Sequence, residues 1–267
     1  MAVTMTEIAD DLRAESAELI AMLAPLDAAD WDRATPAKGW MIRDQVSHLA
    51  WNDDATLRAI TDPEGFVAQR PTNLEAIQQM VDRVITDHRH LAPAELLDWF
   101  KGSRDALLAT IVDRDPSDRL PWFGPDMSLA SKITARLMET WAHTQDVADA
   151  LGIERDPSPR IRHVIFLGLR AIPNTFRIRG RPVPENPLRV ELDAPDGSRW
   201  AFGPPDAEDL VTGPALDLAL VVTQRRHRAD TALTATGAFA DEWLDVAQAY
   251  AGPPGPGREP LAGRGPR

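Results

Sequence analysis

The sequence predicts an α+β protein in which a helical bundle is followed by a small α+β domain. Apolar residues recur every three or four positions through much of residues 5–151, which is the spacing of a buried helix face. Residues 188–193 instead alternate apolar and polar side chains, as a strand with one buried face does. Asp196 and Gly197 then favour a tight turn, after which residues 199–202 can pair back as a β-hairpin.

The two patterns meet near Pro157 and Pro159, which stiffen the chain and indicate a domain boundary. We therefore expect the helical domain at residues 1–155 and the α+β domain at residues 156–251. Residues 252–267 are rich in Gly, Pro and Arg and offer little apolar surface to bury, so we expect a disordered tail there.

Five helices are predicted in the first domain. Thr4 and Glu7 form a capping-box pattern, so the first helix begins after Thr4 and continues to Pro25. Residues 62–65 read Asp-Pro-Glu-Gly and are expected to break the chain after the second helix. Pro93 suits the first turn of the fourth helix. The remaining helices are expected at residues 42–60, 73–89, 94–112 and 128–151.

The connection at residues 115–125 is too aromatic for an ordinary solvated linker, because it contains Trp122 and Phe123. We expect both rings to pack back onto the bundle or to line a pocket beside the fifth helix.

The second domain is expected to contain helices as well as the hairpin. Residues 161–172 are apolar and helical in pattern, whereas residues 174–187 are basic and Pro-rich and are predicted to be a loop. Residues 209–212 fit another strand. Further helices are expected from Pro214 and over residues 239–250.

Composition narrows the classes of function. The formal net charge of −12 argues against nucleic acid as the main partner, because neutralising phosphates requires a basic surface. The chain has no cysteine, which excludes disulfides, thiolate metal ligands and a cysteine nucleophile. It has no apolar run of membrane-spanning length and no signal-peptide layout at its start, so we expect a cytoplasmic protein without a membrane partner.

The residues with the clearest chemical potential are Glu139 and His143. They are four positions apart in a predicted helix, so both side chains lie on one face, one turn apart, where a carboxylate and an imidazole can hold one metal ion. His48, in the second helix, is the best candidate for a third ligand. Two imidazoles and a carboxylate suit zinc, nickel or iron, and the spacing does not choose among them.

A plain surface pair is the alternative interpretation of Glu139 and His143. Apolar neighbours, among them Met138 and Trp141, argue that this face is not fully solvated. A buried carboxylate then needs a partner, which a metal ion supplies.

A helix carrying a histidine, followed by a helix with Glu-x-x-x-His, resembles the DinB-like metal-binding bundle. More narrowly, the runs at residues 121–125, 135–143 and 145–150 resemble the N-terminal domain of mycothiol-dependent maleylpyruvate isomerases, in an actinobacterial metal-binding subfamily. Many DinB relatives have histidine where this chain has Glu139. Residues 211–220 resemble, more weakly, the small domain appended to those isomerases.

The resemblance implies a four-helix bundle with a three-ligand metal site formed by His48, Glu139 and His143. Open positions on the metal would accept water or a substrate. It also implies mycothiol as a cosubstrate, which would attack a small electrophile in an isomerase or S-transferase reaction. The expected partners are therefore a small-molecule thiol and an electrophile, with the protein a monomer or homodimer.

Two other functions stay open at this point, and no catalytic side chain is assigned. The protein can be a non-catalytic metal or small-ligand binding module. Metal-assisted hydrolysis would require a carboxylate such as Asp44 or Asp53 beside the metal-bound water. These carboxylates, like Arg43 and Asp54, can instead orient the ligand histidines or be simple solvated charges.

Overall fold

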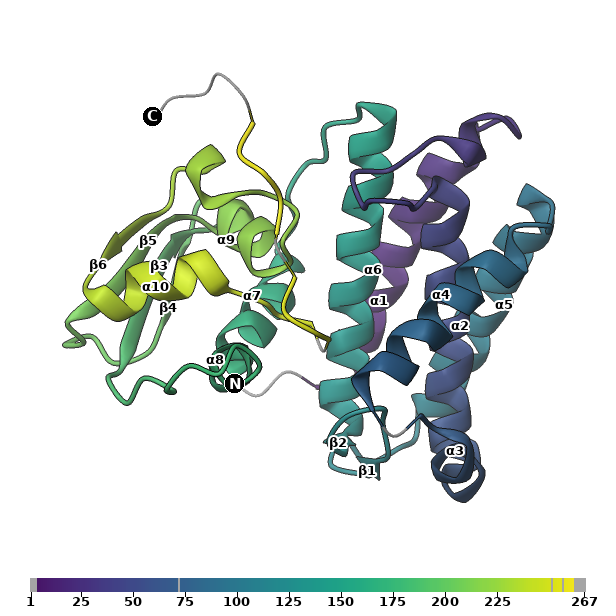
Figure 1. Ribbon diagram of the computed structural model, residues 1–267, viewed down its shortest axis with the longest axis horizontal. Helices are drawn as coiled ribbons and strands as arrows, with labels where there is room; N and C mark the ends of the chain where they lie inside the picture. The colour runs from purple at the N-terminus through teal and green to yellow at the C-terminus, as the bar shows by residue number, and fades with distance from the viewer. Residues whose placement is uncertain (1–3, 72, 251, 256, 262–267) are drawn as a thin grey trace. The chain divides into compact units, whose positions relative to one another are not determined.

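The computed structural model describes residues 4–71, 73–250, 252–255 and 257–261. The chain divides into two compact units, residues 1–155 and 156–267. The first is helical apart from one very short hairpin, and the second combines helices with a four-stranded sheet (Figure 1). The predicted α+β class is therefore confirmed.

The first unit contains six helices and a short 3₁₀ turn at Asp30–Asp32 in its described residues. The helices are α1 (Met5–Leu23), α2 (Ile42–Thr61), α3 (Pro63–Gln69), α4 (Leu74–His88), α5 (Pro93–Ile111) and α6 (Leu129–Leu151). All five predicted helices are present, and their ends lie within two residues of the expected positions. The capping box at Thr4 and Glu7 is formed, and Ser128 caps α6 by accepting a hydrogen bond from the Ser131 backbone N–H.

The break expected at residues 62–65 is instead the start of the short helix α3. Asp62 ends α2 and caps α3, its side chain accepting a hydrogen bond from the Gly65 backbone N–H, and Pro63 occupies the first turn. A Cβ atom at Gly65 would lie 2.0 Å from the Asp62 carboxylate. Residues typical of a chain break can therefore also be a cap, and helical periodicity cannot reveal a helix of seven residues.

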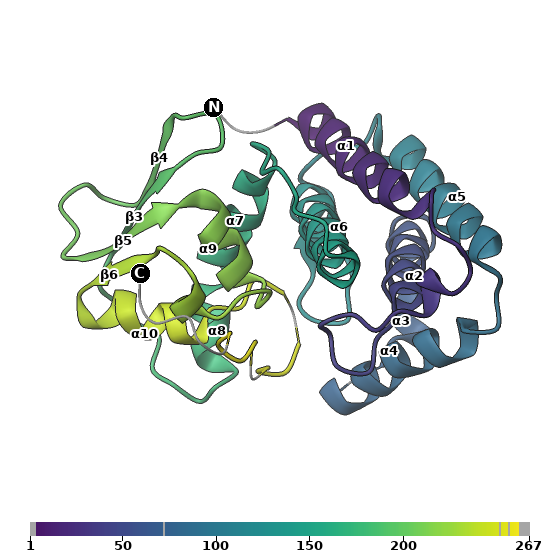
Figure 2. The same ribbon diagram turned by 90° about the horizontal axis from the view of Figure 1, so that it is seen from above.

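Helix α2 is the centre of the first unit, and it packs against α3, α4, α5 and α6, while α1 packs against α6 (Figure 2). The helices bury one apolar core between them. Its fully buried members include Leu19, Ile42, Val46, Leu49, Leu96, Phe100 and Val147.

The aromatic connection between α5 and α6 packs onto the bundle, as predicted. It forms a small antiparallel hairpin from β1 (Arg119–Leu120) and β2 (Met127–Ser128). Phe123 stacks on Trp51 of α2, and Trp122 stacks on Phe66 of α3.

The second unit contains four helices and four strands in its described residues. The helices are α7 (Ile161–Arg170), α8 (Ile172–Arg177), α9 (Ala215–Val222) and α10 (Ala238–Val246). The strands are β3 (Leu188–Asp193), β4 (Arg199–Phe202), β5 (Asp209–Pro214) and β6 (Thr234–Thr236), in the sheet order β4-β3-β5-β6. The predicted hairpin is the antiparallel pair β3 and β4, with Leu192 opposite Trp200, while β5 runs parallel to β3.

Three details of the second unit differ from the expectation. Helix α8 lies in a stretch assigned largely to a loop, because Pro173 suits a first turn as well as a loop. The sequence does not predict strand β6, because its three residues are too few to show an alternation of apolar and polar side chains. The last helix ends at Val246 and not at Tyr250.

The disorder predicted for residues 252–267 remains a prediction. Residues 256 and 262–267 lie outside the described part of the chain. Residues 252–255 and 257–261 are described without helix or strand, and the Leu261 backbone N–H donates to Asp230. Among the described residues, every helix is too short or too polar to cross a bilayer.

Candidate metal centre

Helices α2 and α6 bring the three predicted ligands together. Glu139 Oε2 lies 3.2 Å from His143 Nε2 and 3.7 Å from His48 Nε2. One ligand atom from each residue lies within 4.8 Å of the others, which is close enough for a single metal ion. Other contacts between α2 and α6 help to hold the ligands in this arrangement. In one of them Arg136, one turn before Glu139, donates a hydrogen bond to the Leu49 carbonyl at 3.2 Å.

The tautomer of His143 is set by Gln45, which the sequence did not single out. The Gln45 side-chain N–H group donates to Thr35 Oγ1 at 2.9 Å, so its oxygen faces the imidazole. That oxygen accepts a hydrogen bond from His143 Nδ1, which therefore carries the proton. In this tautomer the lone pair of the ring is on Nε2, the nitrogen that faces Glu139. A ligand histidine is oriented in this way by a polar partner on its other nitrogen.

The lone pair of the neutral His48 ring is on Nε2. The Asn52 side-chain N–H group lies 3.0 Å from His48 Nε2, whereas Nδ1 is buried and has no hydrogen-bond partner among the described residues. Burial lowers the pKa of His48 from 6.5 to about 4, which keeps the ring neutral near pH 7.

Glu139 is ionised in this environment. Burial alone would raise its pKa, but its close contacts with the rings of His143 and His48 outweigh that effect and hold the pKa well below its usual range. Its side chain is 25% exposed, compared with 11% for His48 and 9% for His143, so the cluster is accessible from the Glu139 side.

The ring of Trp40 covers both histidines. It stacks on His143 at a centroid distance of 5.8 Å and meets His48 edge-on at 5.2 Å. Because the Trp40 backbone carbonyl accepts hydrogen bonds from Thr35, the ring and Gln45 are held by the same short segment. The segment before α2 thus fixes the histidines on one side.

Three acceptors converge at the centre of this cluster: two imidazole lone pairs and one carboxylate oxygen. Such a set is repulsive unless a cation lies between its members, and a buried carboxylate requires a counter-charge. The residues therefore fit a divalent metal ion with two nitrogen ligands and one oxygen ligand.

A buried ion network joins the helices beside the cluster. Asp53 is fully buried and accepts from Arg104 at 2.7 Å and from Arg136 at 2.9 Å. Arg104 also donates to Thr140 of α6 at 3.1 Å and to Ser16 of α1. One carboxylate thus links α2, α5 and α6, and through Arg104 it reaches α1.

The charged residues near His48 contact residues other than the ligand histidines, and Asp54 is exposed. Asp44 is buried and binds Arg89 at 2.6 Å while capping the start of α2. Arg43 pairs with Asp32 at 2.6 Å. Asp54 accepts from the Trp99 ring N–H at 2.7 Å. These contacts join different segments of the bundle. The sequence could not predict them, because helical periodicity does not show which polar positions of a helix face another segment.

Lys132 lies on the same face of α6, two turns before Glu139. It is only 3% exposed, and its ammonium nitrogen lies 2.7 Å from the centroid of the Trp122 ring. Burial lowers the pKa of Lys132 well below its usual range, and the positive charge of Arg136 adds to this effect.

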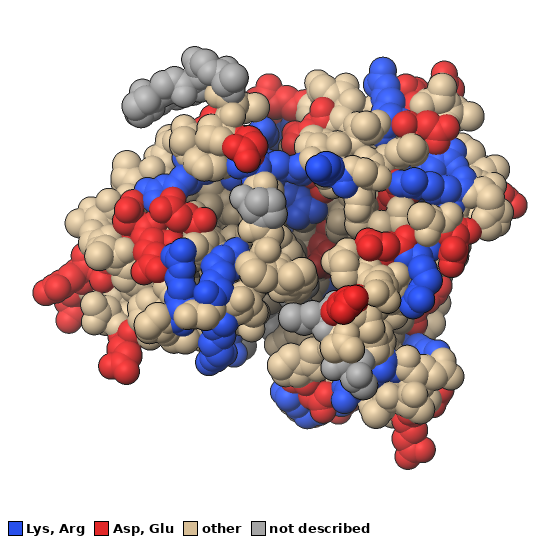
Figure 3. Space-filling model, in the orientation of Figure 1, with Lys and Arg blue, Asp and Glu red and all other residues tan. Residues whose placement is uncertain are grey.

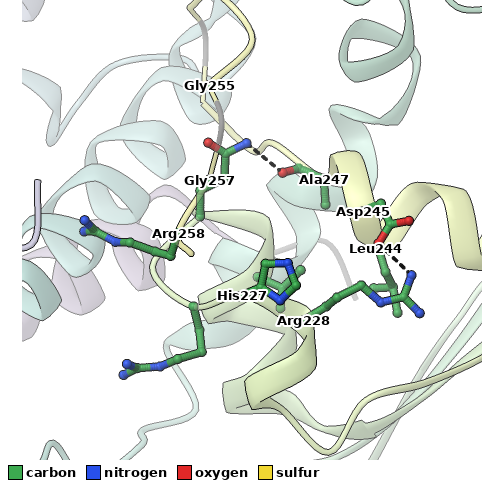
Figure 4. Close-up of a pocket in the computed structure, with 11 residues that line it drawn as sticks. His227, Arg228, Leu244, Asp245, Ala247, Gly255, Gly257 and Arg258 are labelled. Atoms are coloured by element: carbon green, nitrogen blue, oxygen red, sulfur yellow. Dashed lines mark hydrogen bonds and ion pairs between the residues drawn. The ribbon is translucent and has the colours of Figure 1, made fainter. Parts of the chain in front are cut away.

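The second unit contains a cavity of about 80 Å³ of its own (Figure 4). His227 and Arg228 are in its lining. Arg228 is compensated by Asp241 at 2.6 Å and by Asp245 at 2.9 Å, and His227 Nδ1 accepts from the Ala229 backbone N–H. The only group of three metal-ligating side chains found in the described part of the chain is the one in the first unit.

Acidic and basic side chains are intermixed on the face shown in Figure 3. Lys and Arg residues lie next to Asp and Glu residues on the surface of each unit. In the second unit, exposed ion pairs join Arg181 to Glu242 and Arg199 to Asp193.

Comparison with known proteins identifies the family. The family profile described as the mycothiol maleylpyruvate isomerase N-terminal domain matches residues 12–148, which include all three clustered ligands. The chain belongs to this family. Proteins of Mycobacterium tuberculosis strains H37Rv and CDC 1551, both described as uncharacterized, are 44% identical to it over 248 residues. Those matches cover 93% of this chain and 96% of each relative.

Solved structures confirm the fold of this family member. The crystal structure of a mycothiol-dependent maleylpyruvate isomerase matches with a TM-score of 0.58 at 18% identity, and a histidine-to-alanine mutant of that enzyme matches with 0.59. Each match covers 87% of this chain and 93% of the other. The likeness therefore extends over both units.

Proposed function

We propose that the chain is a metal-dependent enzyme that uses a low-molecular-weight thiol, such as mycothiol, to isomerise a small electrophile or to form a thioether with it. The observation that carries the proposal is the convergence of His48, Glu139 and His143 within 4.8 Å, with the His48 imidazole neutral and the carboxylate ionised. Membership in the mycothiol maleylpyruvate isomerase N-terminal domain family supports the choice of thiol.

The metal would be held by His48 Nε2, His143 Nε2 and a Glu139 oxygen. Zinc suits this set best, and nickel or iron is also compatible with it. When bound, the metal would lower the pKa of a thiol at its open coordination position and so supply the nucleophile at neutral pH. The absence of cysteine from the chain requires that the thiol come from a small molecule.

The protein's own residues prepare the site for this chemistry. Gln45 keeps His143 in the tautomer that leaves Nε2 free, and burial keeps His48 neutral. Trp40 excludes water from the histidine side, while the partly exposed Glu139 marks the side from which a thiol and an electrophile would enter.

Hydrolysis with Asp44 or Asp53 as the base is not favoured by the contacts. Asp53 is bound by two arginines and Asp44 by Arg89, so both carboxylates are already occupied. A non-catalytic metal-binding role is the remaining alternative, and it differs in expecting no acceleration of any thiol reaction.

The first test is metal content, measured by plasma mass spectrometry on wild type, His48→Ala and Glu139→Ala. We expect near-stoichiometric metal in wild type and loss in both variants. His88→Ala is the matched control, because His88 contacts Trp99 and the Val84 carbonyl and not the cluster. Wild-type protein that neither retains metal nor takes it up on reconstitution would refute the proposal.

The second test separates an enzyme from a binding module. Metal-loaded protein is mixed with mycothiol and a panel of small electrophiles, and thiol consumption is followed. Acceleration that disappears in Glu139→Ala supports the enzyme, whereas metal binding without acceleration supports the module. In the cell we expect a cytoplasmic protein that acts on small molecules as a monomer or homodimer, with neither nucleic acid nor membrane as a partner.

A further inference from the structure

Lys132 is a buried lysine whose amino group forms no ion pair with the residues that the structure describes. The residue is only 3% exposed, and its amino nitrogen contacts the ring of Trp122 and not a carboxylate. A lysine this little exposed is rare unless an acidic group is paired with it. The position is therefore unexplained by packing alone.

The neighbouring carboxylates cannot serve as its partner. Asp53 and Glu139 are the acidic groups that influence Lys132 electrostatically. Asp53 already accepts from two arginines, and Glu139 Oε2 faces both site histidines. Arg136 adds a further positive charge on the same helix face. Both nearby carboxylates are thus engaged by other groups, and neither is paired with Lys132.

The surroundings of Lys132 suit a flat molecule. Trp122 covers the ammonium, Phe66 stacks on Trp122 at 5.6 Å, and Phe123 stacks on Trp51 at 5.7 Å. Trp51, Trp122 and Phe123 are only partly buried, so the layer is reached from solvent. Trp122 lies on the connection between β1 and β2, where Arg70 holds its carbonyl at 2.8 Å.

The site lies beside the candidate metal centre. Lys132 and Glu139 are seven residues apart on α6, which places them on one face with a separation of roughly 10 Å along the helix axis. Trp51 is likewise one turn after His48 on α2. A small molecule held at Lys132 would therefore extend toward the metal ligands.

We propose that Lys132 is a specificity-determining residue whose ammonium binds a carboxylate of the electrophilic substrate, with the rings of Trp51, Phe66, Trp122 and Phe123 packing against its planar part. The assignment of this carboxylate to a substrate rests on the proposed function. Binding of a carboxylate at Lys132 does not itself require the metal. The carboxylate contacts the ammonium beside the Trp122 ring and supplies the negative charge that Asp53 and Glu139 do not.

The experiment measures benzoate binding to the full chain through tryptophan fluorescence, with a chelator present so that the metal cannot hold the carboxylate. Benzamide, which has the same shape without the charge, is the control ligand. We expect benzoate to bind more tightly than benzamide, and Lys132→Met to weaken benzoate by about 10-fold or more, as for loss of a hydrogen bond to a charged group. Lys132→Arg should retain part of the preference, and Lys38→Met, at an exposed lysine, should retain all of it.

Two outcomes would overturn the proposal. In one, Lys132→Met and wild type bind benzoate equally. In the other, benzoate binds only to the metal-loaded protein. Lys132→Gln serves as a second neutral variant if Lys132→Met fails to fold. Metal content is measured on the same samples, so an absent metal centre is distinguished from an absent carboxylate site.

Discussion

Gln45 is the residue on which the geometry of the candidate centre most depends, after the ligands themselves. It fixes the tautomer of His143 and is itself fixed by Thr35. We expect Gln45→Leu to lower metal affinity by roughly 10- to 100-fold without unfolding the protein. Competition with a chromophoric chelator measures the affinity. Gln145→Leu is the matched control, because Gln145 donates to Asp149 and leaves the ligands untouched. Equal affinities in the two variants would refute this role.

His48 makes the stability of the metal-free protein dependent on pH. Its pKa falls from 6.5 to about 4 on folding, so between these values the unfolded chain binds the extra proton and stability decreases as pH falls. The difference, 6.5 − 4, corresponds to about 3 kcal/mol when complete. The low pKa of Glu139 acts in the same direction but only below its unfolded value of 4.5.

Denaturant unfolding of chelated protein at pH 7 and pH 5 tests this linkage, because the carboxylate contributes little in that range. We expect His48→Gln, which has no proton to gain there, to lose less stability between the two pH values than wild type. An identical pH dependence in the two proteins would contradict the assignment.

At the scale of elements, the Asp53 network sets the register of α2 on α6. One carboxylate is paired with both Arg104 and Arg136, so removing the charge of Asp53 and removing the charge of Arg136 should have different effects on stability. Asp53→Asn leaves two buried cations and should destabilise by about 3–5 kcal/mol. Arg136→Met leaves Asp53 paired with Arg104 and should cost less. Urea unfolding compares them, and a larger loss in Arg136→Met would show that the network does not work in this way.

The elements also show what the sequence could and could not predict. Long helices and the hairpin were predictable, because periodicity and caps such as Thr4 are local signals. Glu139 and His143 were predictable as a pair for the same reason. Gln45 and Lys132 were not, since their roles depend on contacts between segments distant in sequence, Gln45 with His143 and Lys132 with Trp122. The short α3, α8 and β6 offered too few residues for a period.

At the scale of the whole molecule, the division at residues 155 and 156 predicts how metal acts on stability. The three ligands belong to the first unit, whereas the second has a core of its own around β3 and α9, including Val190 and Leu218. A ligand that binds only the folded state stabilises it by about 2.7 kcal/mol at a concentration 100-fold above its Kd. That stabilisation should be confined to the first unit.

We therefore expect calorimetry of the full chain to show two transitions, of which a chelator lowers only one. The chelator-sensitive transition should become insensitive in His48→Ala. Val190→Ala, in the buried part of β3, should lower the other transition and leave the chelator response unchanged. The opposite outcome is a single cooperative transition that moves as a whole with the chelator, in His48→Ala and in Val190→Ala. It would mean that the units unfold together and that metal bound by the helices stabilises the sheet as well.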